Sequence, residues 1–456
     1  MSQPKEKFIY DADHIVFDRK HRKTIKFNIS RYDKAVEAGK ARYQNLELAK
    51  QRAAAIKEKA VDHLADYLIQ FEKNITSNGA EVIWAEDRND ALKAILKILK
   101  DEMAQTVVKS KSMISEELEL NEAIQNEGIE SLETDLGEYI VQLAGEKPYH
   151  ILTPAMHKSK EDIAELFHQK FDTPEESTPA FLTAYVRKLL REKFVHADVG
   201  ITGANFLVAD TGSVALTENE GNGMMTFSFP KVHIVLAGIE KIIPAMKDLG
   251  VLWPLLATHG TGQQITVYNS IISGPRKNNE TDGPCKMVVI LLDNQRTNLY
   301  AHDDQYQSLK CIRCGACLNA CPIYKNVGGY TYAATYSGPI GSVITPFYNG
   351  LKEYNHLSSA CSVCGKCSSV CPVKIPLHKL LLYNRRDAVD EGDGSWMWNQ
   401  GMKAFEYAFS KRKRLNLVGG KMKNFLGAAG KNALGKDKQL PTFANKSFSQ
   451  QWKSKQ

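Results

Sequence analysis

The sequence has no long uncharged hydrophobic segment. In this chain of 456 residues the apolar runs, such as 234–239 and 287–292, are far shorter than the ~20 residues that cross a bilayer. Residues 1–10 contain no apolar stretch of the kind that a secretory signal requires. We therefore expect a soluble, cytoplasmic protein without a transmembrane segment.

Two nucleotide-binding signatures are also missing. No G-x-G-x-x-G opens a helix after an expected strand, so no Rossmann site for NAD or FAD is indicated. Segment 258–264 contains glycines but lacks the spacing and the Gly-Lys-Ser/Thr ending of a phosphate loop. Its His259 is expected to be an ordinary loop histidine. If the chain serves hydride chemistry, we expect that step on a partner or on an unrecognised cofactor.

The basic charge is confined to one end of the chain. The net charge is +7, but residues 402–456 hold thirteen lysines and arginines against two acids. The rest of the chain is therefore slightly acidic, with a net charge of −4. This distribution does not favour nucleic-acid binding by the body of the protein. For the basic tail, docking on an acidic partner or membrane surface and a solvated terminus both remain open.

Cysteine is nearly confined to two copies of one motif. The spacing C-x2-C-x2-C-x3-C-P, which ends at Pro322 and Pro372, is typical of sites for cubane [4Fe–4S] clusters. The eight cysteines of the two copies are Cys311, Cys314, Cys317 and Cys321, then Cys361, Cys364, Cys367 and Cys371. The ninth, Cys285, has no neighbouring cysteine and is expected to be an ordinary thiol. Such usage fits a reducing compartment.

The motifs predict two clusters with exchanged fourth ligands, as in two-cluster ferredoxins. The predicted ligands of cluster 1 are Cys311, Cys314, Cys317 and Cys371. Those of cluster 2 are Cys361, Cys364, Cys367 and Cys321. Gly315 and Gly365 should let the backbone close around each cluster and offer N–H donors. Structural zinc is the alternative, but zinc sites usually offer paired C-x2-C knuckles and not triplets.

Ahead of the cysteines, the pattern predicts an α/β domain around a largely parallel sheet. A helix is expected over 33–71, followed by alternating strands and helices and then, over 195–236, by short β-type runs separated by glycines. Expected strands are 81–85, 106–110, 150–153, 264–268 and 286–292; expected helices are 88–100, 115–127 and 160–171. With 43% apolar residues the chain can bury a core, and its length suggests about three domains.

The cysteine region is predicted to be helical. Segment 322–360, between the motifs, is longer than a compact ferredoxin hairpin needs, and 376–383 is predicted to form a helix. We expect aromatic residues of this linker to shield the clusters from water. Among them are Tyr324, Tyr330, Tyr332 and Tyr336.

Several segments resemble a known family. The cysteine arrangement is similar to iron–sulfur subunits of glycerol-3-phosphate dehydrogenase and heterodisulfide reductase. The preceding region resembles the LUD domain, and the order of the two parts over 71–383 resembles the lactate utilization protein B family. The LUD-like segments are VKSKSM (108–113), ETDLGE (133–138), HILTPA (150–155), GANFLVADTGS (203–213) and YNSIISGPR (268–276).

The resemblance implies a fold, a function and partners. The fold would be an N-terminal helical extension (1–70), a LUD α/β domain similar to the sugar-phosphate isomerase and CoA-transferase group (71–300), an α-helical two-cluster ferredoxin domain (301–385) and a basic C-terminal extension (386–456). The function would be part of L-lactate oxidation to pyruvate. The partners would be a cysteine-rich subunit with CCG motifs and a second LUD protein.

Two weaker signals concern a ligand pocket. The turn 210–213 and the segment 218–223 either line a pocket or form structural turns. Lys109, Lys111 and Ser112 follow an expected strand and either bind a carboxylate or phosphate at the next helix, or form a solvated edge.

Three functions remain open. The first is an electron-transfer subunit of a lactate-oxidising complex, and the second is an oxidoreductase that binds a small carboxylate or acyl compound in its own LUD domain. The third is a redox-sensing or assembly protein in which the clusters serve structure. The catalytic residues are unknown. Two clusters favour a relay over a sensor.

Overall fold

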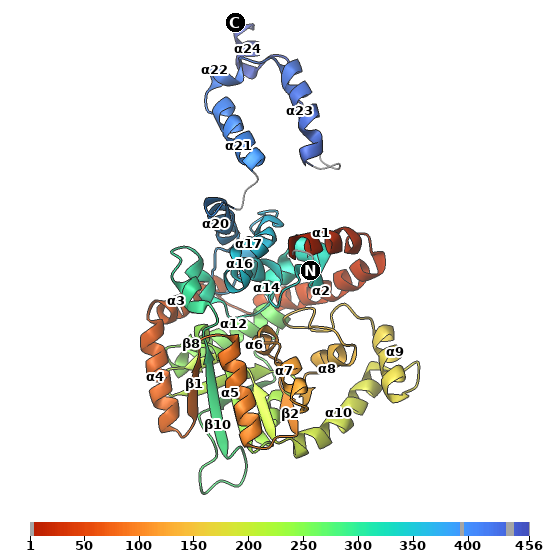
Figure 1. Cartoon of the computed structure of the whole chain (residues 1–456), viewed down its shortest axis with the longest axis vertical. Coiled ribbons are helices and arrows are strands. Elements are labelled where there is room, and N and C mark those ends of the chain that lie inside the picture. Colours follow the sequence, from red (N-terminus) through yellow and green to blue (C-terminus); the bar gives the residue numbers. More distant parts are fainter. Residues whose placement is uncertain (1–3, 393–395, 435–441, 456) are drawn as a thin grey trace. The chain divides into compact units, whose positions relative to one another are not determined.

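The computed structural model describes residues 4–392, 396–434 and 442–455. The chain divides into two compact units, residues Met1–Asp387 and Ala388–Gln456 (Figure 1). The first unit contains the N-terminal helices, the α/β region and the cysteine motifs. No helix in the described ranges is long and apolar enough to cross a bilayer.

Four helices open the first unit. Their bounds are α1 Pro4–Ile15, α2 Arg19–Lys40, α3 Leu46–Asp62 and α4 Leu64–Ser77. The single helix expected over 33–71 is wrong: α2 already begins at Arg19, and the chain is interrupted between Lys40 and Leu46 and again at His63. Side chains cap the starts of α2 and α3. Asp18 accepts a hydrogen bond of 2.9 Å from the N–H of His21, and Asn45 accepts one of 2.9 Å from the N–H of Leu48. Both caps satisfy backbone donors that a helix start leaves unpaired.

A six-stranded parallel sheet forms the centre of the α/β region. Its strand order is β1-β10-β7-β4-β2-β3, and each neighbouring pair is parallel. The bounds are β1 Glu81–Ala85, β2 Thr106–Lys109, β3 Glu130–Glu133, β4 Val199–Thr202, β7 Val232–Gly238 and β10 Lys286–Leu292. The predicted parallel α/β architecture is confirmed.

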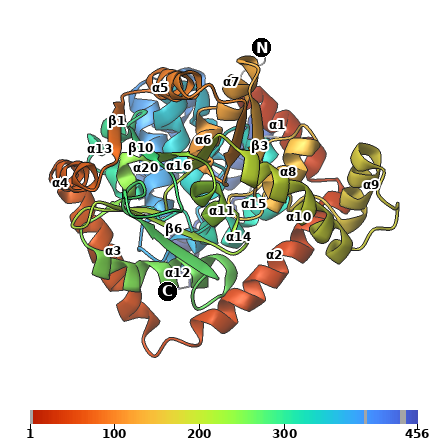
Figure 2. The same ribbon diagram turned by 90° about the horizontal axis from the view of Figure 1, so that it is seen from below.

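The sheet is buried on both faces, as parallel sheets are. On one face, Val288 and Ile290 share a core with Ile95 and Leu99 of helix α5 (Arg88–Asp101). On the other face, Val289 packs with helix α4 and with a second sheet of order β8-β5-β6-β9. Figure 2 shows α4, β10 of the parallel sheet and β6 of the second sheet. The bounds of this second sheet are β5 Phe206–Val208, β6 Ser213–Glu218, β8 Ile242–Ile243 and β9 Tyr268–Ile272.

The remaining helices of the α/β region flank these sheets. They are α6 Met113–Glu117, α7 Leu120–Asn126, α8 Leu136–Leu143, α9 Lys160–Phe171, α10 Pro179–His196, α11 Asn222–Ser228, η1 Ile239–Lys241, η2 Met246–Asp248, α12 Leu249–Thr261 and α13 Arg296–Tyr300. The helix expected over 115–127 is interrupted, because Glu119 takes a left-handed φ of 52°.

Three local predictions on this region are wrong. Segment 150–153 is irregular and not a strand, because His150 turns its ring back to accept an N–H from Leu152 at 3.0 Å. The strand expected over 264–268 starts only at Tyr268, where pairing with β6 begins. His259 lies in the last turns of α12 and is buried, so it is not a loop histidine.

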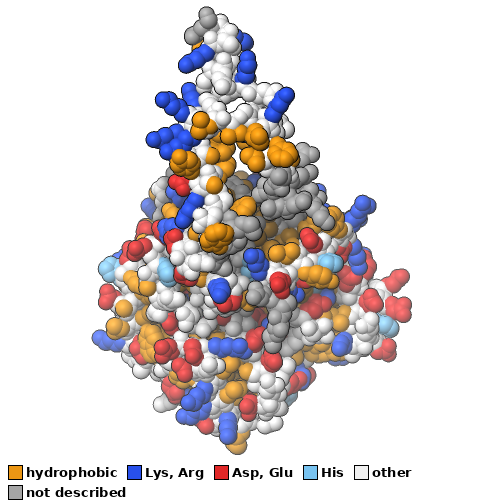
Figure 3. Space-filling model, turned by 45° about the horizontal axis from the view of Figure 1, so that its top comes forward, with side chains coloured by type: hydrophobic (Ala, Val, Ile, Leu, Met, Phe, Trp, Pro, Cys, Tyr) orange, Lys and Arg blue, Asp and Glu red, His pale blue; other side chains and the backbone are white. Residues whose placement is uncertain are grey.

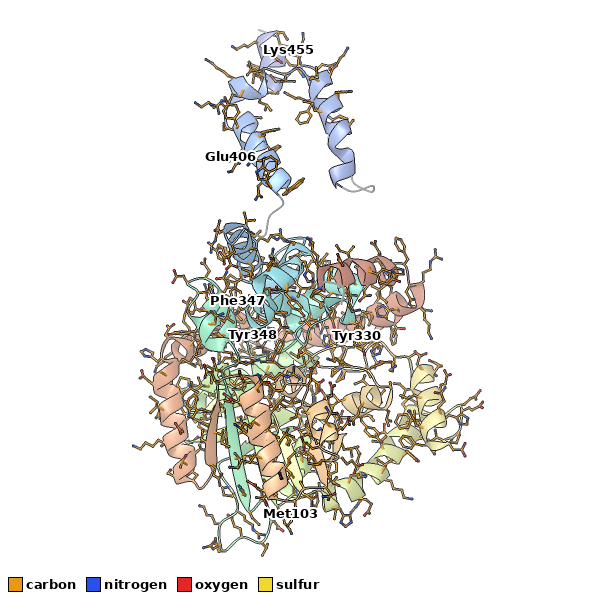
Figure 4. The ribbon with its side chains drawn as sticks, viewed as in Figure 1. Met103, Tyr330, Phe347, Tyr348, Glu406 and Lys455 are labelled. Atoms are coloured by element: carbon orange, nitrogen blue, oxygen red, sulfur yellow. The ribbon has the colours of Figure 1, made fainter. Side chains whose placement is uncertain are left out.

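The cysteine region is helical, as predicted. Its elements are η3 Gln305–Lys310, α14 Ala316–Ala320, α15 Pro322–Val327, η4 Tyr330–Tyr332, α16 Gly338–Asn349, α17 Leu351–Tyr354, α18 His356–Ser359, α19 Lys366–Val370 and α20 Leu377–Asp390. It shares one core with the N-terminal helices and the α/β region, in which Ile25, Phe206 and Leu318 are all buried. Tyr348 and Tyr330 lie where the helices meet the α/β layer, and Met103 lies at the opposite end of the sheet (Figure 4).

The described residues of the second unit form helices that leave large apolar side chains exposed. Its elements are α21 Trp396–Phe409, α22 Arg412–Leu415, α23 Gly420–Leu434 and α24 Phe448–Lys453. Trp396, Phe425 and Phe448 are each exposed by more than two thirds. Hydrophobic side chains gather on this unit, whereas acidic and basic side chains alternate over the visible face of the first unit (Figure 3).

Candidate functional site

Each cysteine motif folds as the same tight loop before a short helix. Arg313 and Val363, at equivalent positions, take left-handed φ values of 58° and 54°, and Gly315 and Gly365 take 72° and 76°. The loops turn two backbone donors toward sulfur. The N–H of Arg313 donates to Sγ of Cys311 at 3.4 Å, and that of Val363 donates to Sγ of Cys361 at 3.2 Å. Helices α14 and α19 then lie side by side.

The last cysteine of each motif lies in electrostatic range of the other motif. Burial raises the pKa of the Cys314 thiol, and negative charge on Cys371 raises it further. Burial likewise raises the pKa of Cys321, and charge on Cys361 adds to this. A small cavity is lined by the four thiols of Cys311, Cys314, Cys317 and Cys371 together with apolar groups.

These thiols fit an iron–sulfur cluster chemically. Burial raises the pKa of Cys367 and Cys371 to about 11, so thiolates here need positive charge close by. A bound metal supplies that charge and keeps the coordinating thiols deprotonated. Iron–sulfur clusters, when bound, accept and release single electrons. In the described ranges, no three His, Cys, Asp or Glu side chains lie close enough together to hold a single metal ion.

The two sets of thiols differ in exposure. The difference lies at the second cysteine of each motif: Cys314 is 8% exposed, whereas Cys364 is exposed. Cys311 and Cys361 are both partly exposed, and the other cysteines of the motifs are buried. The second motif therefore reaches the surface at Cys364. The unassigned Cys285 is an exposed thiol outside both motifs.

The four tyrosines expected to shield the clusters have different surroundings. Tyr332 is buried, and negative charge on Cys321 and Cys361 contributes to the rise of its pKa, so it lies close to the thiols. Tyr324 donates to the backbone oxygen of Tyr149 at 3.0 Å. Tyr330 is 39% exposed and donates to the oxygen of Lys147, and the ring of Tyr336 covers the guanidinium of Arg313. The expected shielding of clusters therefore suits Tyr332 best.

A cavity of about 890 Å³ lies next to the first motif, at the carboxyl ends of the parallel strands. Open α/β sheets usually bind ligands at this edge. Its wall includes residues that follow β2, β3, β4 and β7, and the loop of the first motif also contributes Arg313. The charged residues of the wall are Arg31, Lys111, Asp135, Lys158, Glu218, Glu220, Glu240, Lys241, Arg296 and Arg313.

Only some of the residues that the sequence suggested for a ligand pocket line this cavity. Lys111, Ser112 and part of 218–223 line the cavity. The turn 210–213 does not line it. There Asn74 donates to the oxygen of Asp210 at 3.1 Å, and a Cβ on Gly212 would lie 2.2 Å from the backbone of Ile75, so this turn is structural.

Lys109 is not free to bind a ligand. Its ammonium is fully buried, 2.5 Å from a carboxylate oxygen of Glu133 and 2.7 Å from Oγ of Ser115. Burial lowers the pKa of Lys109, but the negative charge of Glu133, together with that of Glu116 and Glu138, holds it above its usual value. The helix that follows β2 has five residues only.

A buried charge network forms the wall nearest the first motif. Glu240 pairs with Arg296 at 2.6 Å and with Arg313 at 3.4 Å, and these cations hold its pKa at about 2 in spite of burial. Arg296 pairs in addition with Glu117 at 2.9 Å. Burial lowers the pKa of Lys241 to about 8. These residues were not identified from the sequence. One signal was present: the first cysteine motif has an arginine, Arg313, where the second motif has a valine, Val363.

Comparison with known proteins identifies both parts of the chain. Residues 68–292 match the LUD domain, and residues 307–375 match the 4Fe-4S dicluster domain, so the chain carries iron–sulfur clusters. Lactate utilization protein B of Bacillus subtilis (strain 168) is 42% identical over 364 residues, which cover 79% of this chain and 76% of that protein. Lactate utilization protein B of Bacillus velezensis shows the same values.

A second kind of relative has a less specific name. The "Uncharacterized electron transport protein YkgF" of Escherichia coli (strain K12) is 42% identical over 361 residues, 79% of this chain and 76% of that protein. With its LUD domain, its dicluster domain and this level of identity over most of its length, the chain belongs to the lactate utilization protein B family.

Proposed function

We propose that this protein is the iron–sulfur electron-transfer subunit of a cytoplasmic complex that oxidises L-lactate to pyruvate. The observation that carries the proposal is the presence of two adjacent cysteine sites, one facing an interior cavity and one reaching the surface. Oxidation of lactate to pyruvate releases two electrons and two protons, and each cluster takes one electron at a time. The names of the relatives, which are called lactate utilization protein B, support lactate as the substrate.

The ligand sets of the proposal are crossed. Cluster 1 takes Cys311, Cys314, Cys317 and Cys371; cluster 2 takes Cys361, Cys364, Cys367 and Cys321. The influence of Cys371 on the pKa of Cys314, and of Cys361 on that of Cys321, supports this exchange.

The difference in exposure supports a direction for the relay. Electrons would enter at cluster 1, beside the cavity, and leave at cluster 2, where Cys364 is exposed. A redox partner can approach a cluster closely only where the ligands reach the surface. The partners of the proposal are a cysteine-rich subunit with CCG motifs and a second LUD protein.

The second candidate is a self-sufficient oxidoreductase. The cavity of about 890 Å³ in the LUD domain favours it, because this size is typical of small-molecule sites. In that case a carboxylate or acyl substrate would bind in this chain and be oxidised without the partner proteins.

The test uses the purified protein with reconstituted clusters. Cluster reduction is followed by electron paramagnetic resonance after addition of L-lactate, first to this protein alone and then with both partners. The relay proposal expects reduction only with the partners, and D-lactate serves as the control. Reduction by L-lactate alone would support the second candidate, whereas clusters that stay oxidised in every combination would contradict both.

A further inference from the structure

The cavity beside the first motif contains a buried donor without a partner. Arg313 is 10% exposed, and its Nη2 lies 3.4 Å from Glu240. Its Nη1 is buried and donates no hydrogen bond to any described residue. The ring of Tyr336, 4.4 Å from the guanidinium carbon, covers one face of the side chain. A buried guanidinium with a free N–H is costly unless a ligand or water accepts from it.

Lys241 provides a second cation on the same wall. In the part of the chain that the structure describes, its ammonium forms no hydrogen bond or ion pair. Arg296, by contrast, is occupied by the carboxylates of Glu117 and Glu240. The wall around Arg313 therefore retains the capacity to bind an anion.

The internal repeat shows that the cysteine loop itself does not need this arginine. Val363 occupies the equivalent position of the second motif with nearly the same φ and donates the same kind of hydrogen bond to sulfur. The difference between the loops lies in their surroundings: Arg313 lines the cavity, and Val363 does not. The arginine is thus associated with the cavity and not with loop geometry.

A different part of the cavity wall carries acceptors. Glu218 accepts the N–H groups of Gly223 at 2.8 Å and Met224 at 2.7 Å, and Glu220 accepts that of Leu136 at 3.1 Å. Asp135 lies in electrostatic range of both carboxylates. Carboxylates that line a cavity suit ligand groups that donate hydrogen bonds, such as hydroxyls.

We propose that this cavity binds an organic anion whose carboxylate or phosphate group contacts Arg313 and Lys241 and whose hydroxyl groups face the acidic wall. The ligand then lies beside the loop of the first motif. A three-carbon acid would fill a small part of about 890 Å³, whereas a phosphate-bearing cofactor would fill much more. A redox role for the bound anion rests on the proposed function, whereas the binding of an anion in this cavity does not.

The two cations have one alternative role. They can compensate the negative charge of thiolate ligands, because charge on Cys311 interacts with both Arg313 and Lys241. In that case their removal would shift the reduction potential of a cluster and leave ligand binding unchanged.

The test is isothermal titration calorimetry on the cluster-loaded chain without partner proteins. The carboxylate probes are L-lactate and pyruvate, and the phosphate probes are inorganic phosphate and flavin mononucleotide. We expect saturable binding either of a carboxylate probe or of a phosphate probe, and the probe that binds identifies the anionic group of the ligand. Arg313→Gln and Lys241→Gln should each weaken it between about ten- and a hundredfold, the range for a lost hydrogen bond to a charged group.

The matched control is Lys366→Gln, which removes an exposed cation from the second motif. It should leave the binding constant unchanged. Iron content and melting temperature show whether each variant is intact, and Lys241→Gln, outside the cysteine loops, decides the question if Arg313→Gln loses iron. Absence of binding by every probe would overturn the proposal. So would a Lys241→Gln variant that binds with the affinity of the unmodified protein and has a shifted cluster reduction potential. Neither result bears on lactate-dependent reduction with the partners.

Discussion

The Nε atom of Arg296 donates a hydrogen bond of 2.6 Å to Oε2 of Glu240, and both side chains are almost completely buried. Arg296 follows the last strand of the parallel sheet, and Glu240 lies just after β7. The other oxygen of Glu240 faces Arg313 of the first cysteine motif at 3.4 Å. One carboxylate therefore joins the α/β region to the cysteine region.

Replacement of Arg296 by methionine should be strongly destabilising. It would leave the carboxylates of Glu117 and Glu240 buried without their cation, and breaking a buried pair in this way costs about 3–5 kcal/mol. The free energy of unfolding from urea titration measures the loss. The control is Lys193→Met, since Lys193 and Glu130 form an exposed pair that contributes less than about 1 kcal/mol. Equal losses in the two variants would contradict the role of the buried network.

Pairs of cysteine substitutions should reveal which ligands share a cluster. With crossed ligands, Cys371→Ala combined with Cys311→Ala damages one cluster, and the protein should keep about four of about eight iron atoms. Cys371→Ala combined with Cys361→Ala damages both clusters, and the iron content should approach zero. Iron and sulfide analysis of the reconstituted variants is the measurement. The reverse pattern would mean that each motif holds its own cluster.

Gly341→Ala should destabilise the segment around Tyr336, whose ring lies over the guanidinium of Arg313. The added Cβ would lie 2.0 Å from the backbone oxygen of Tyr336, whose hydroxyl donates to Glu117 at 2.6 Å. The clash should cost about 1–3 kcal/mol, measured as a lower melting temperature. Gly250→Ala is the control: it lies in α12 with no atom near the added Cβ, and it should be neutral or stabilise by up to about 1 kcal/mol. A neutral Gly341→Ala would show that the segment around Tyr336 can move.

His233 should make the protein less stable in mild acid. Burial in β7 lowers the pKa of this histidine to about 3, whereas the unfolded chain has the ordinary value near 6.5. Between these values the unfolded state binds more protons, so stability is present above pH 6.5 and is lost as the pH falls. From pH 7.5 to 5.5 the loss from this group is about 1.4 kcal/mol.

The urea midpoint at both pH values measures this loss. His233→Asn should reduce the difference between them, and His196→Asn should not, because His196 is 74% exposed. An unchanged difference in His233→Asn would show that other groups cause the acid sensitivity.

The sequence predicted what depends on local pattern. Apolar runs such as 286–292 predicted buried strands, and cysteine spacing predicted the cluster motifs, because neighbouring residues suffice for both. Predictions failed where one side chain or backbone angle interrupts a pattern. The cap at Asn45 and the left-handed Glu119 broke expected helices, and His150 replaced an expected strand by a loop.

By itself, the sequence determined the kind of cofactor and the α/β architecture. Only the tertiary structure decided which side chains of the α/β region contact the cysteine motifs. Lys109, for which the sequence left a ligand site and a solvated edge open, forms a buried internal ion pair, whereas Arg313 reaches the cavity. Glu240 joins Arg296, 56 residues away, and Arg313, 73 residues away. No local pattern encodes such contacts, because they form only when the carboxyl ends of the strands and the cysteine loop bury the same charges together.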